Sequence, residues 1–167
     1  MTVREILLLG NPRLYKSSTP VTTGDLDTVD SVIEDLHDTM MRFRSEWGAG
    51  RAMAAPQIGE FKRIVYVNID EPLALLNPEI VERSKEMFEL WDDCMSFPHL
   101  LVKVRRHRRI VVEYRDRSWN KTRMEYTGDM SELLQHEIDH LDGILAVQRA
   151  IDSKAFSVRF QREVLRD

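Results

Sequence analysis

The sequence predicts an α+β fold in which an N-terminal helix and a C-terminal helix pack on mostly antiparallel β-sheets. Three observations indicate this: one long helical period near the start, six short β-rich runs in the middle, and a return to helical spacing after Asp129. The 167 residues are 43% hydrophobic and 31% charged, an ordinary balance for a soluble globular protein. Because no repeat, low-complexity tract or linker divides the chain, we expect residues 1–167 to form a single domain.

The helical period near the start covers residues 26–47. Its apolar side chains recur in steps of three and four, so they would line one face of a helix: Leu26, Val29, Ile33, Leu36, Met40, Phe43 and Trp47. Thr23 or Asp25 can cap the start of this helix, and Gly48 can end it.

The middle of the chain contains six runs rich in Val, Ile, Tyr and Phe, separated by prolines and polar turns. They cover residues 63–68, 74–84, 86–91, 100–104, 108–115 and 122–127. The basic stretch KVRRHRR at 103–109 could dock an anionic partner such as RNA. We favour the solvated face of a strand whose alternate residues Val102, Val104 and Ile110 point inward, because basic residues also prevent edge-to-edge pairing.

Helical spacing returns between Asp129 and about Val147. The apolar positions of this second helix are Leu133, Leu134, Leu141, Ile144 and Leu145. A shorter amphipathic stretch around Phe156, Phe160 and Val164 would close the chain.

The second helix carries the chemical signal of the sequence, the run HEIDH at 136–140. Residues four apart project from one face of a helix, so His136 and His140 can bind one metal ion together. Glu137 is one step round the helix and can reach a water molecule without binding the metal itself. This pattern is typical of a metal-dependent hydrolase.

A third ligand is needed, and the sequence offers few candidates. Metalloproteases of the metzincin type would place a third histidine where this chain has Ala146, and Glu163 is in a short C-terminal segment with no supporting pattern. The remaining soft donor is Cys94, the only cysteine, which excludes an internal disulfide and fits a reducing cytosol. Otherwise Cys94 would be a small buried hydrophobe. One thiolate and two imidazoles leave a position open for water, as in catalytic sites.

Taken together, three motifs of the chain resemble those of the peptide deformylase family. GRAMAAPQ at 50–57 is similar to the family motif GxGLAAxQ, DDCMS at 92–96 to EGCLS, and QHEIDHLDG at 135–143 to QHExDHLxG. The resemblance runs almost end to end. It implies a peptide-deformylase-like fold and removal of the formyl group from the N-terminal methionine of newly made polypeptides, a step of protein biosynthesis in the cytoplasm.

The resemblance also implies one divalent metal ion per chain. This ion would be Fe(II) natively, with Zn(II), Ni(II) or Co(II) as replacements, and its ligands would be Cys94, His136 and His140. Glu137 would be the acid and base of the reaction.

The resemblance further implies an oxyanion site and a supporting carboxylate. The side-chain amide of Gln57 and the backbone N–H of Met95 would stabilise the oxyanion. Asp139, beside His140, could orient a ligand or cap the site from behind the ligands.

The region that the resemblance implies for substrate binding departs from the family pattern. The residues concerned are Gly50, Arg51, Ala52, Asp93, Asp129 and Leu133. Arg51 replaces an aliphatic residue, Ala52 replaces a glycine and needs a negative φ, and Asp93 replaces the glycine before the cysteine. We expect Arg51 to pair with Asp93 or Asp129, or else to point to solvent and leave methionine binding intact.

These departures leave alternatives open beside an active deformylase. One is a deformylase-like amidase acting on a different formylated or acylated substrate, and another is a non-catalytic metal-binding homologue; an endopeptidase is favoured least. The expected partner is a formylated peptide or nascent chain, with a weak ribosome contact. A net charge of −4 gives no case for DNA or an anionic membrane, and the apolar run at 6–10 is too short to span one.

Overall fold

The computed structural model of the protein describes residues 2–165, and its elements confirm the α+β prediction. The helices are α1 (Leu26–Trp47) and α2 (Gly128–Leu141). The strands are β1 (Ala52–Ala54), β2 (Ile64–Asn68), β3 (Pro72–Arg83), β4 (Met87–Asp92), β5 (Leu100–His107), β6 (Arg109–Arg115), β7 (Lys121–Thr127) and β8 (Phe156–Val158). Short 3₁₀ helices are η1 (Pro12–Tyr15), η2 (Thr23–Asp25), η3 (Ala55–Ile58), η4 (Ala146–Arg149) and η5 (Arg159–Leu165).

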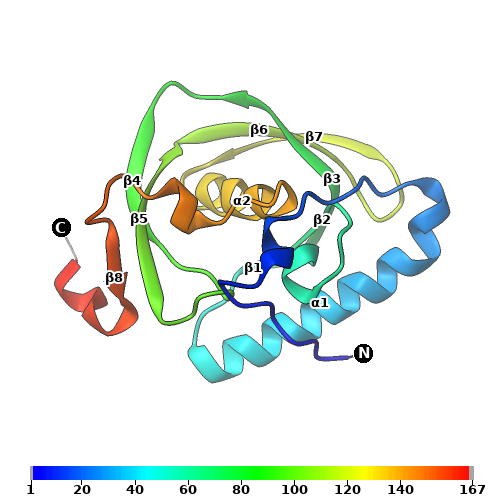
Figure 1. Cartoon of the computed structure of the whole chain (residues 1–167). Coiled ribbons are helices and arrows are strands. Elements are labelled where there is room, and N and C mark those ends of the chain that lie inside the picture. Colours follow the sequence, from blue (N-terminus) through cyan, green and yellow to red (C-terminus); the bar gives the residue numbers. More distant parts are fainter. Residues whose placement is uncertain (1, 166–167) are drawn as a thin grey trace.

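The strands form two antiparallel sheets, with α2 between them. One sheet has the order β1-β2-β3-β6-β7 and the other the order β4-β5-β8. In Figure 1, α2 lies in the middle of the molecule, with β4 and β5 on one side of it and β6 and β7 on another. It contacts β1 and β7 of the first sheet and β5 of the second, so any polar residue on α2 is enclosed by both sheets.

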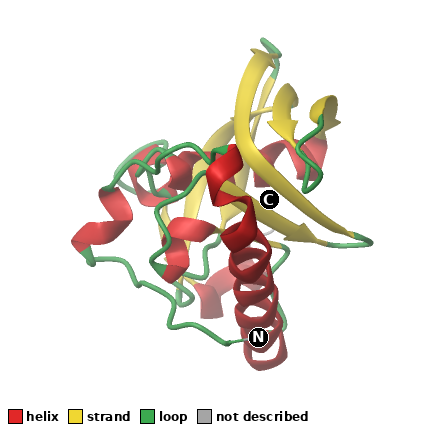
Figure 2. Ribbon diagram, turned by 90° about the vertical axis from the view of Figure 1, so that its right-hand side faces the viewer, coloured by secondary structure: helices red, strands yellow, loops and turns green. Residues whose placement is uncertain are grey.

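Helix α1 covers the outer face of the larger sheet, as its apolar spacing predicted. Its inward residues Val29, Ile33, Leu36, Met40 and Phe43 are all buried, and Gly48 ends it in the left-handed region at φ 64°. Figure 2 shows α1 as the long helix in front of the strands.

Alternation along β2 separates the two faces of the larger sheet. Ile64 and Tyr66 pack in the cluster that contains α1, whereas Val65 and Val67 pack with Leu134 and its neighbours on α2. The core therefore has a layer on each side of this sheet, and α2 is held against the sheet by its apolar residues.

The second helix is shorter than predicted and stops at Leu141 rather than near Val147. Gly143 has a φ of 73°, and a Cβ there would lie 2.4 Å from the carbonyl oxygen of Tyr15. The chain must turn at this glycine because the N-terminal segment passes too close for a side chain. Ile144 and Leu145 follow the turn, outside α2.

The prediction of an amphipathic C-terminal stretch was wrong. Phe156 belongs to strand β8, which pairs with β5. Phe160 and Val164 lie in η5 and are 83% and 73% exposed. Backbone hydrogen bonding of residues 156–158 to the edge of β5 takes the place of the amphipathic packing that the spacing of the apolar residues indicated.

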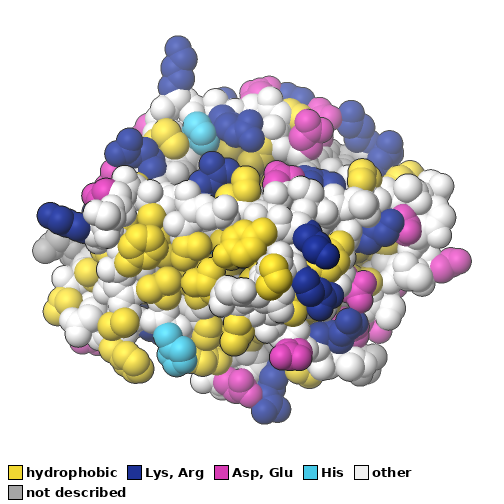
Figure 3. Space-filling model, viewed as in Figure 1, with side chains coloured by type: hydrophobic (Ala, Val, Ile, Leu, Met, Phe, Trp, Pro, Cys, Tyr) yellow, Lys and Arg dark blue, Asp and Glu magenta, His cyan; other side chains and the backbone are white. Residues whose placement is uncertain are grey.

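The basic stretch 103–109 forms the end of β5 and the start of β6, and most of its cations are paired with acids. Arg105 contacts Glu89, and Arg109 contacts Glu125. On the face shown in Figure 3, basic and acidic side chains are interspersed around an apolar centre. The solvated-strand interpretation therefore holds for these residues, with Arg106 as a buried exception.

Neither described helix has the length and apolar character needed to cross a membrane.

Candidate metal centre and active site

Three buried donors meet at one point inside the molecule. Cys94, in the loop after β4, places its Sγ 3.3 Å from Nε2 of His140, and the Nε2 atoms of His136 and His140 are 3.2 Å apart. The three ligand atoms all lie within 4.8 Å of one another. The sequence predicted this convergence of two helical residues with a distant cysteine.

The spacing of these donors fits one tetrahedral metal ion. With metal–nitrogen bonds of about 2.0–2.1 Å and a metal–sulfur bond of about 2.3 Å, tetrahedral ligand atoms lie about 3.3–3.6 Å apart. The observed separations of 3.2 and 3.3 Å are close to these values. A thiolate with two imidazoles is also a donor set that divalent transition metals accept.

Behind the donors lies a largely buried chain of charged residues, here called the inner network: Asp92, Arg106 and Asp139. The sequence pointed to Asp139 but not to its link with Asp92 through Arg106. Nδ1 of His136 is 2.9 Å from Oδ2 of Asp92, which also accepts from Arg106 at 3.2 Å. Arg106 donates to Asp139 at 2.6 Å through its other terminal nitrogen. Because Nδ1–H of His136 donates to Asp92, the lone pair of Nε2 faces the donor cluster.

The inner network also shows how Asp139 contributes to the site. Asp139 was expected to orient a ligand or to cap the site from behind the ligands, and it contacts Arg106 and Arg149. It therefore supports His136 through Arg106 and Asp92. The alternation of inward and outward side chains along β5 could have identified Arg106 as buried, because residues 102, 104 and 106 share the inward face.

The electrostatics of the site differ between its two histidines. Burial lowers the pKa of His140 well below its ordinary value, so its imidazole is neutral and can bind a cation. Burial also acts to lower the pKa of His136, but the charges of Asp92 and Cys94 outweigh it and raise that pKa well above the usual value. Burial raises the pKa of Glu137 to about 7.

Gln57 lies beside the donors in a fixed orientation. Its Oε1 accepts from the backbone N–H of Ala54 at 2.9 Å. Its Nε2 donates to Oγ of Ser96 at 3.2 Å and lies 3.5 Å from Sγ of Cys94. The backbone of Ala54 thus decides that the NH₂ group, and not the carbonyl, faces the cluster.

Glu137 and Met95 present unused polar atoms at the same place. Oε2 of Glu137 is buried without a hydrogen-bond partner in residues 2–165. The backbone N–H of Met95 also finds no acceptor among the described residues. Buried groups of this kind are normally satisfied, so both are ready for a ligand.

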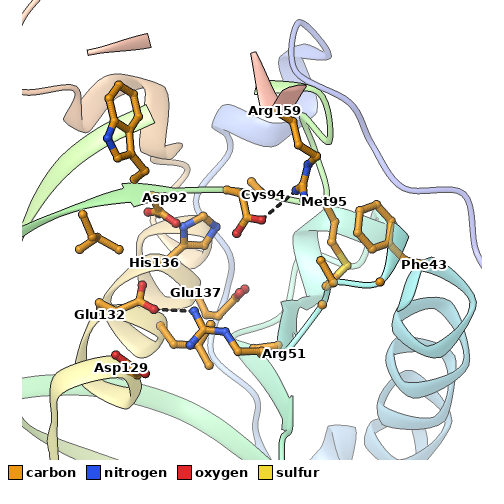
Figure 4. A pocket seen from close by; sticks show the side chains of 18 of the residues that line it. Phe43, Arg51, Asp92, Cys94, Met95, Asp129, Glu132, His136, Glu137 and Arg159 are labelled. Carbon is orange, nitrogen blue, oxygen red and sulfur yellow. Dashed lines mark hydrogen bonds and ion pairs between the residues drawn. The ribbon is translucent and has the colours of Figure 1, made fainter. Parts of the chain in front are cut away.

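The donors open onto a pocket of about 440 Å³ (Figure 4). All six residues that the resemblance implied for substrate binding line it: Gly50, Arg51, Ala52, Asp93, Asp129 and Leu133. Gly50 has a φ of 124° and packs near Met95 and Phe43, so a side chain there would be strained. Ala52 has no positive φ, and its methyl group is accommodated in β1.

The expected partner of Arg51 was wrong. Its guanidinium pairs with Glu132 at 2.5 Å, and Asp93 pairs instead with Arg159 at 2.8 Å and Arg162 at 3.5 Å. Glu132 is one helical turn before His136, so it faces the pocket; that spacing was the missed signal. Burial raises the pKa of Glu132, and the Arg51 guanidinium opposes this shift.

Comparison with known proteins shows similarity along most of the chain. A family model described as polypeptide deformylase matches residues 3–156. A peptide deformylase of Dictyoglomus turgidum is 33% identical over 156 residues, which are 93% of this chain and 97% of that protein. The peptide deformylase structure of Thermotoga maritima has a TM-score of 0.84 at 32% identity, covering 91% of this chain and 100% of that one. A Met-ala-ser bound class I type b peptide deformylase from Acinetobacter baumannii has a TM-score of 0.82 at 27% identity, covering 89% and 98%.

Proposed function

The chain belongs to the peptide deformylase family and removes the N-formyl group from nascent polypeptides, and from this premise we propose how its residues carry out the reaction. Cys94, His136 and His140 hold one divalent metal ion. The convergence of their ligand atoms within 4.8 Å is the observation that carries this proposal. Fe(II) is the native ion, and the same donors accept Zn(II), Ni(II) or Co(II).

The chemistry that such an ion supplies is a lower pKa for the attacking water and a polarised formyl carbonyl. Glu137 takes one proton from the water as the water oxygen attacks the formyl carbon. It then delivers a proton to the amide nitrogen as the C–N bond breaks, so that formate and a free amino terminus result. Its unpartnered Oε2, buried beside the donors, suits this transfer.

Gln57 and Met95 stabilise the negative charge that develops on the formyl oxygen. The amide NH₂ of Gln57 is already oriented by Ala54, and the N–H of Met95 has no competing acceptor in residues 2–165. Fixed donors of this kind need no reorganisation during the reaction, and each one typically contributes about 3–4 kcal/mol.

The pocket takes the beginning of the formylated chain, with methionine as its first residue. In support, one similar structure is bound to Met-ala-ser. The pocket that residues 50–52, 93, 129 and 133 line in this chain also opens onto the metal donors. A thiolate ligand needs a reducing compartment, which supports a cytoplasmic location. A weak ribosome contact would bring the enzyme to nascent chains, but the basic stretch 103–109 gives little support for it because its arginines are already paired.

Glu137→Gln tests the proposal. We expect kcat on formyl-Met-Ala to fall by about 10²–10⁴-fold, because the variant cannot carry the proton, while metal content stays that of the native enzyme. Both proteins are assayed anaerobically, loaded with Fe(II) or with Zn(II). Glu125→Gln, on the exposed surface of β7, is the matched control and keeps native activity. Equal rates for Glu137→Gln and the native enzyme would refute the role of Glu137.

A further inference from the structure

An ion pair that closes one side of the pocket has no part in the reaction described above. Arg51, just before β1, reaches across to Glu132 on α2, and Figure 4 shows the pair beside Glu137 and His136. The Glu132 side chain is 5% exposed and the Arg51 side chain 43%. The carboxylate is thus a buried part of the wall, and the guanidinium covers it from the pocket side.

The first side chain of a formyl peptide must lie close to this pair. The Cα that bears it is two bonds from the formyl carbon, which reacts at the cluster of Cys94, His136 and His140. Glu132 is one helical turn before His136, about 6 Å along the same face. The pocket lined by Arg51 and Glu132 adjoins this cluster, so we place in it the first side chain, which branches next to the reacting amide.

The charges of this wall discriminate among side chains. An acidic side chain would meet the carboxylates of Glu132 and Asp129 on α2. A cationic one would find Glu132 already covered by Arg51. An apolar one would remove water from the guanidinium without replacing its hydrogen bonds, which is unfavourable.

The guanidinium still has donors to offer. Arg51 uses Nη2 on Glu132, and its side chain makes no other hydrogen bond within residues 2–165. Its remaining N–H groups can donate to an uncharged acceptor. Methionine sulfoxide is such a side chain, and it is what a formylated start methionine becomes on oxidation.

We propose that the Arg51–Glu132 ion pair is a specificity determinant that favours a neutral, hydrogen-bond-accepting first side chain, such as methionine sulfoxide, over an apolar one of similar length. This inference rests on the proposed function and adds a substrate class to it. Methionine itself, with its weakly accepting sulfur, lies between the two extremes.

The test compares kcat/KM for three peptides: formyl-methionine-sulfoxide-Ala, formyl-norleucine-Ala and formyl-Met-Ala. For the native enzyme we expect the sulfoxide peptide to be cleaved at least as efficiently as the norleucine peptide. In the double variant Arg51→Leu/Glu132→Leu, which leaves no unpaired charge, the sulfoxide-to-norleucine ratio falls by about tenfold or more. The matched control Arg109→Leu/Glu125→Leu removes a surface pair on β6 and β7 and keeps the native ratio.

The outcomes separate this inference from the function on which it rests. If the native enzyme prefers norleucine over the sulfoxide by tenfold, the inference is wrong, whether or not the variants fold. A purely structural ion pair would slow all peptides equally in the double variant and leave the ratio unchanged, which also overturns it. If none of the three peptides is cleaved, the deformylase function itself fails.

Discussion

Arginine–carboxylate pairs occur both in the inner network, here called the inner wall of the pocket, and at the mouth of the pocket, where Asp93 pairs with Arg159 and Arg162. The two regions differ in how far water reaches them. In the inner network the side chains of Arg106 and Asp92 are 4% and 6% exposed. At the mouth, Asp93 is 28% exposed and one of its partners, Arg162, is 52% exposed. A buried pair cannot lose one member without leaving a charge in a low-dielectric interior, whereas a solvated pair can. Substitution of a charged residue in the inner wall therefore costs much stability, whereas the charged residues of the mouth can vary with the substrate.

Arg106→Met should have the largest effect on stability and tests the inner side of this comparison. Removing the guanidinium leaves Asp92 buried without this cation, and leaves Asp139 paired with Arg149 alone. We expect the free energy of unfolding to fall by about 3–5 kcal/mol. Urea denaturation of native and variant enzyme at equal metal loading measures it.

The neighbouring residue supplies the control for that experiment. Arg105 points to the other face of β5 and pairs with Glu89 in solvent. Arg105→Met should cost about 0–1 kcal/mol, since exposed pairs contribute little. Equal losses for the two variants would contradict the distinction between buried and exposed pairs.

Asp92→Asn should have the next largest effect, on metal affinity. The variant keeps the shape of the side chain but removes the charge that accepts from Nδ1 of His136. Loss of such a supporting carboxylate weakens metal binding by about 10–100-fold. Competition with a chelator at fixed pH measures the change. An unaltered affinity would mean that α2 alone orients His136. His140 is already oriented without such a partner, since its Nδ1 has none in residues 2–165.

Sequence patterns sufficed for the regular parts of the fold and for the reacting groups. The spacing of Val29 to Phe43 defined α1, and Gly48 defined its end. The pair His136 and His140 was visible because helical geometry alone places residues four apart together. Cys94 followed because it is the only cysteine of the chain.

The contacts between distant segments could not be predicted in the same way. Arg51 had two acidic candidates, Asp93 and Asp129, and only the packing of β1 against α2 selects Glu132 instead. Arg106 was grouped with its exposed neighbours in the basic run, although the alternation of Val102 and Val104 puts it on the inward face of β5; its partners Asp92 and Asp139 come from other segments. The C-terminal segment was misjudged because Phe156 pairs with an edge of β5 that only the assembled sheet provides.

Asp93→Asn should have the smallest effect and tests the mouth. Its carboxylate joins the loop after β4 to η5 through Arg159 and Arg162, so the variant weakens a connection between two surface segments. We expect a stability loss of at most about 1 kcal/mol, which corresponds to about 2–4 °C in Tm. Metal affinity should equal that of the native enzyme, in contrast to the adjacent Asp92→Asn. Because salt screens solvated charges, the difference in Tm should disappear at about 1 M salt. A loss that persists at high salt, or one as large as that of Arg106→Met, would show that the mouth is as constrained as the inner wall, and its charges could then not vary freely with the substrate.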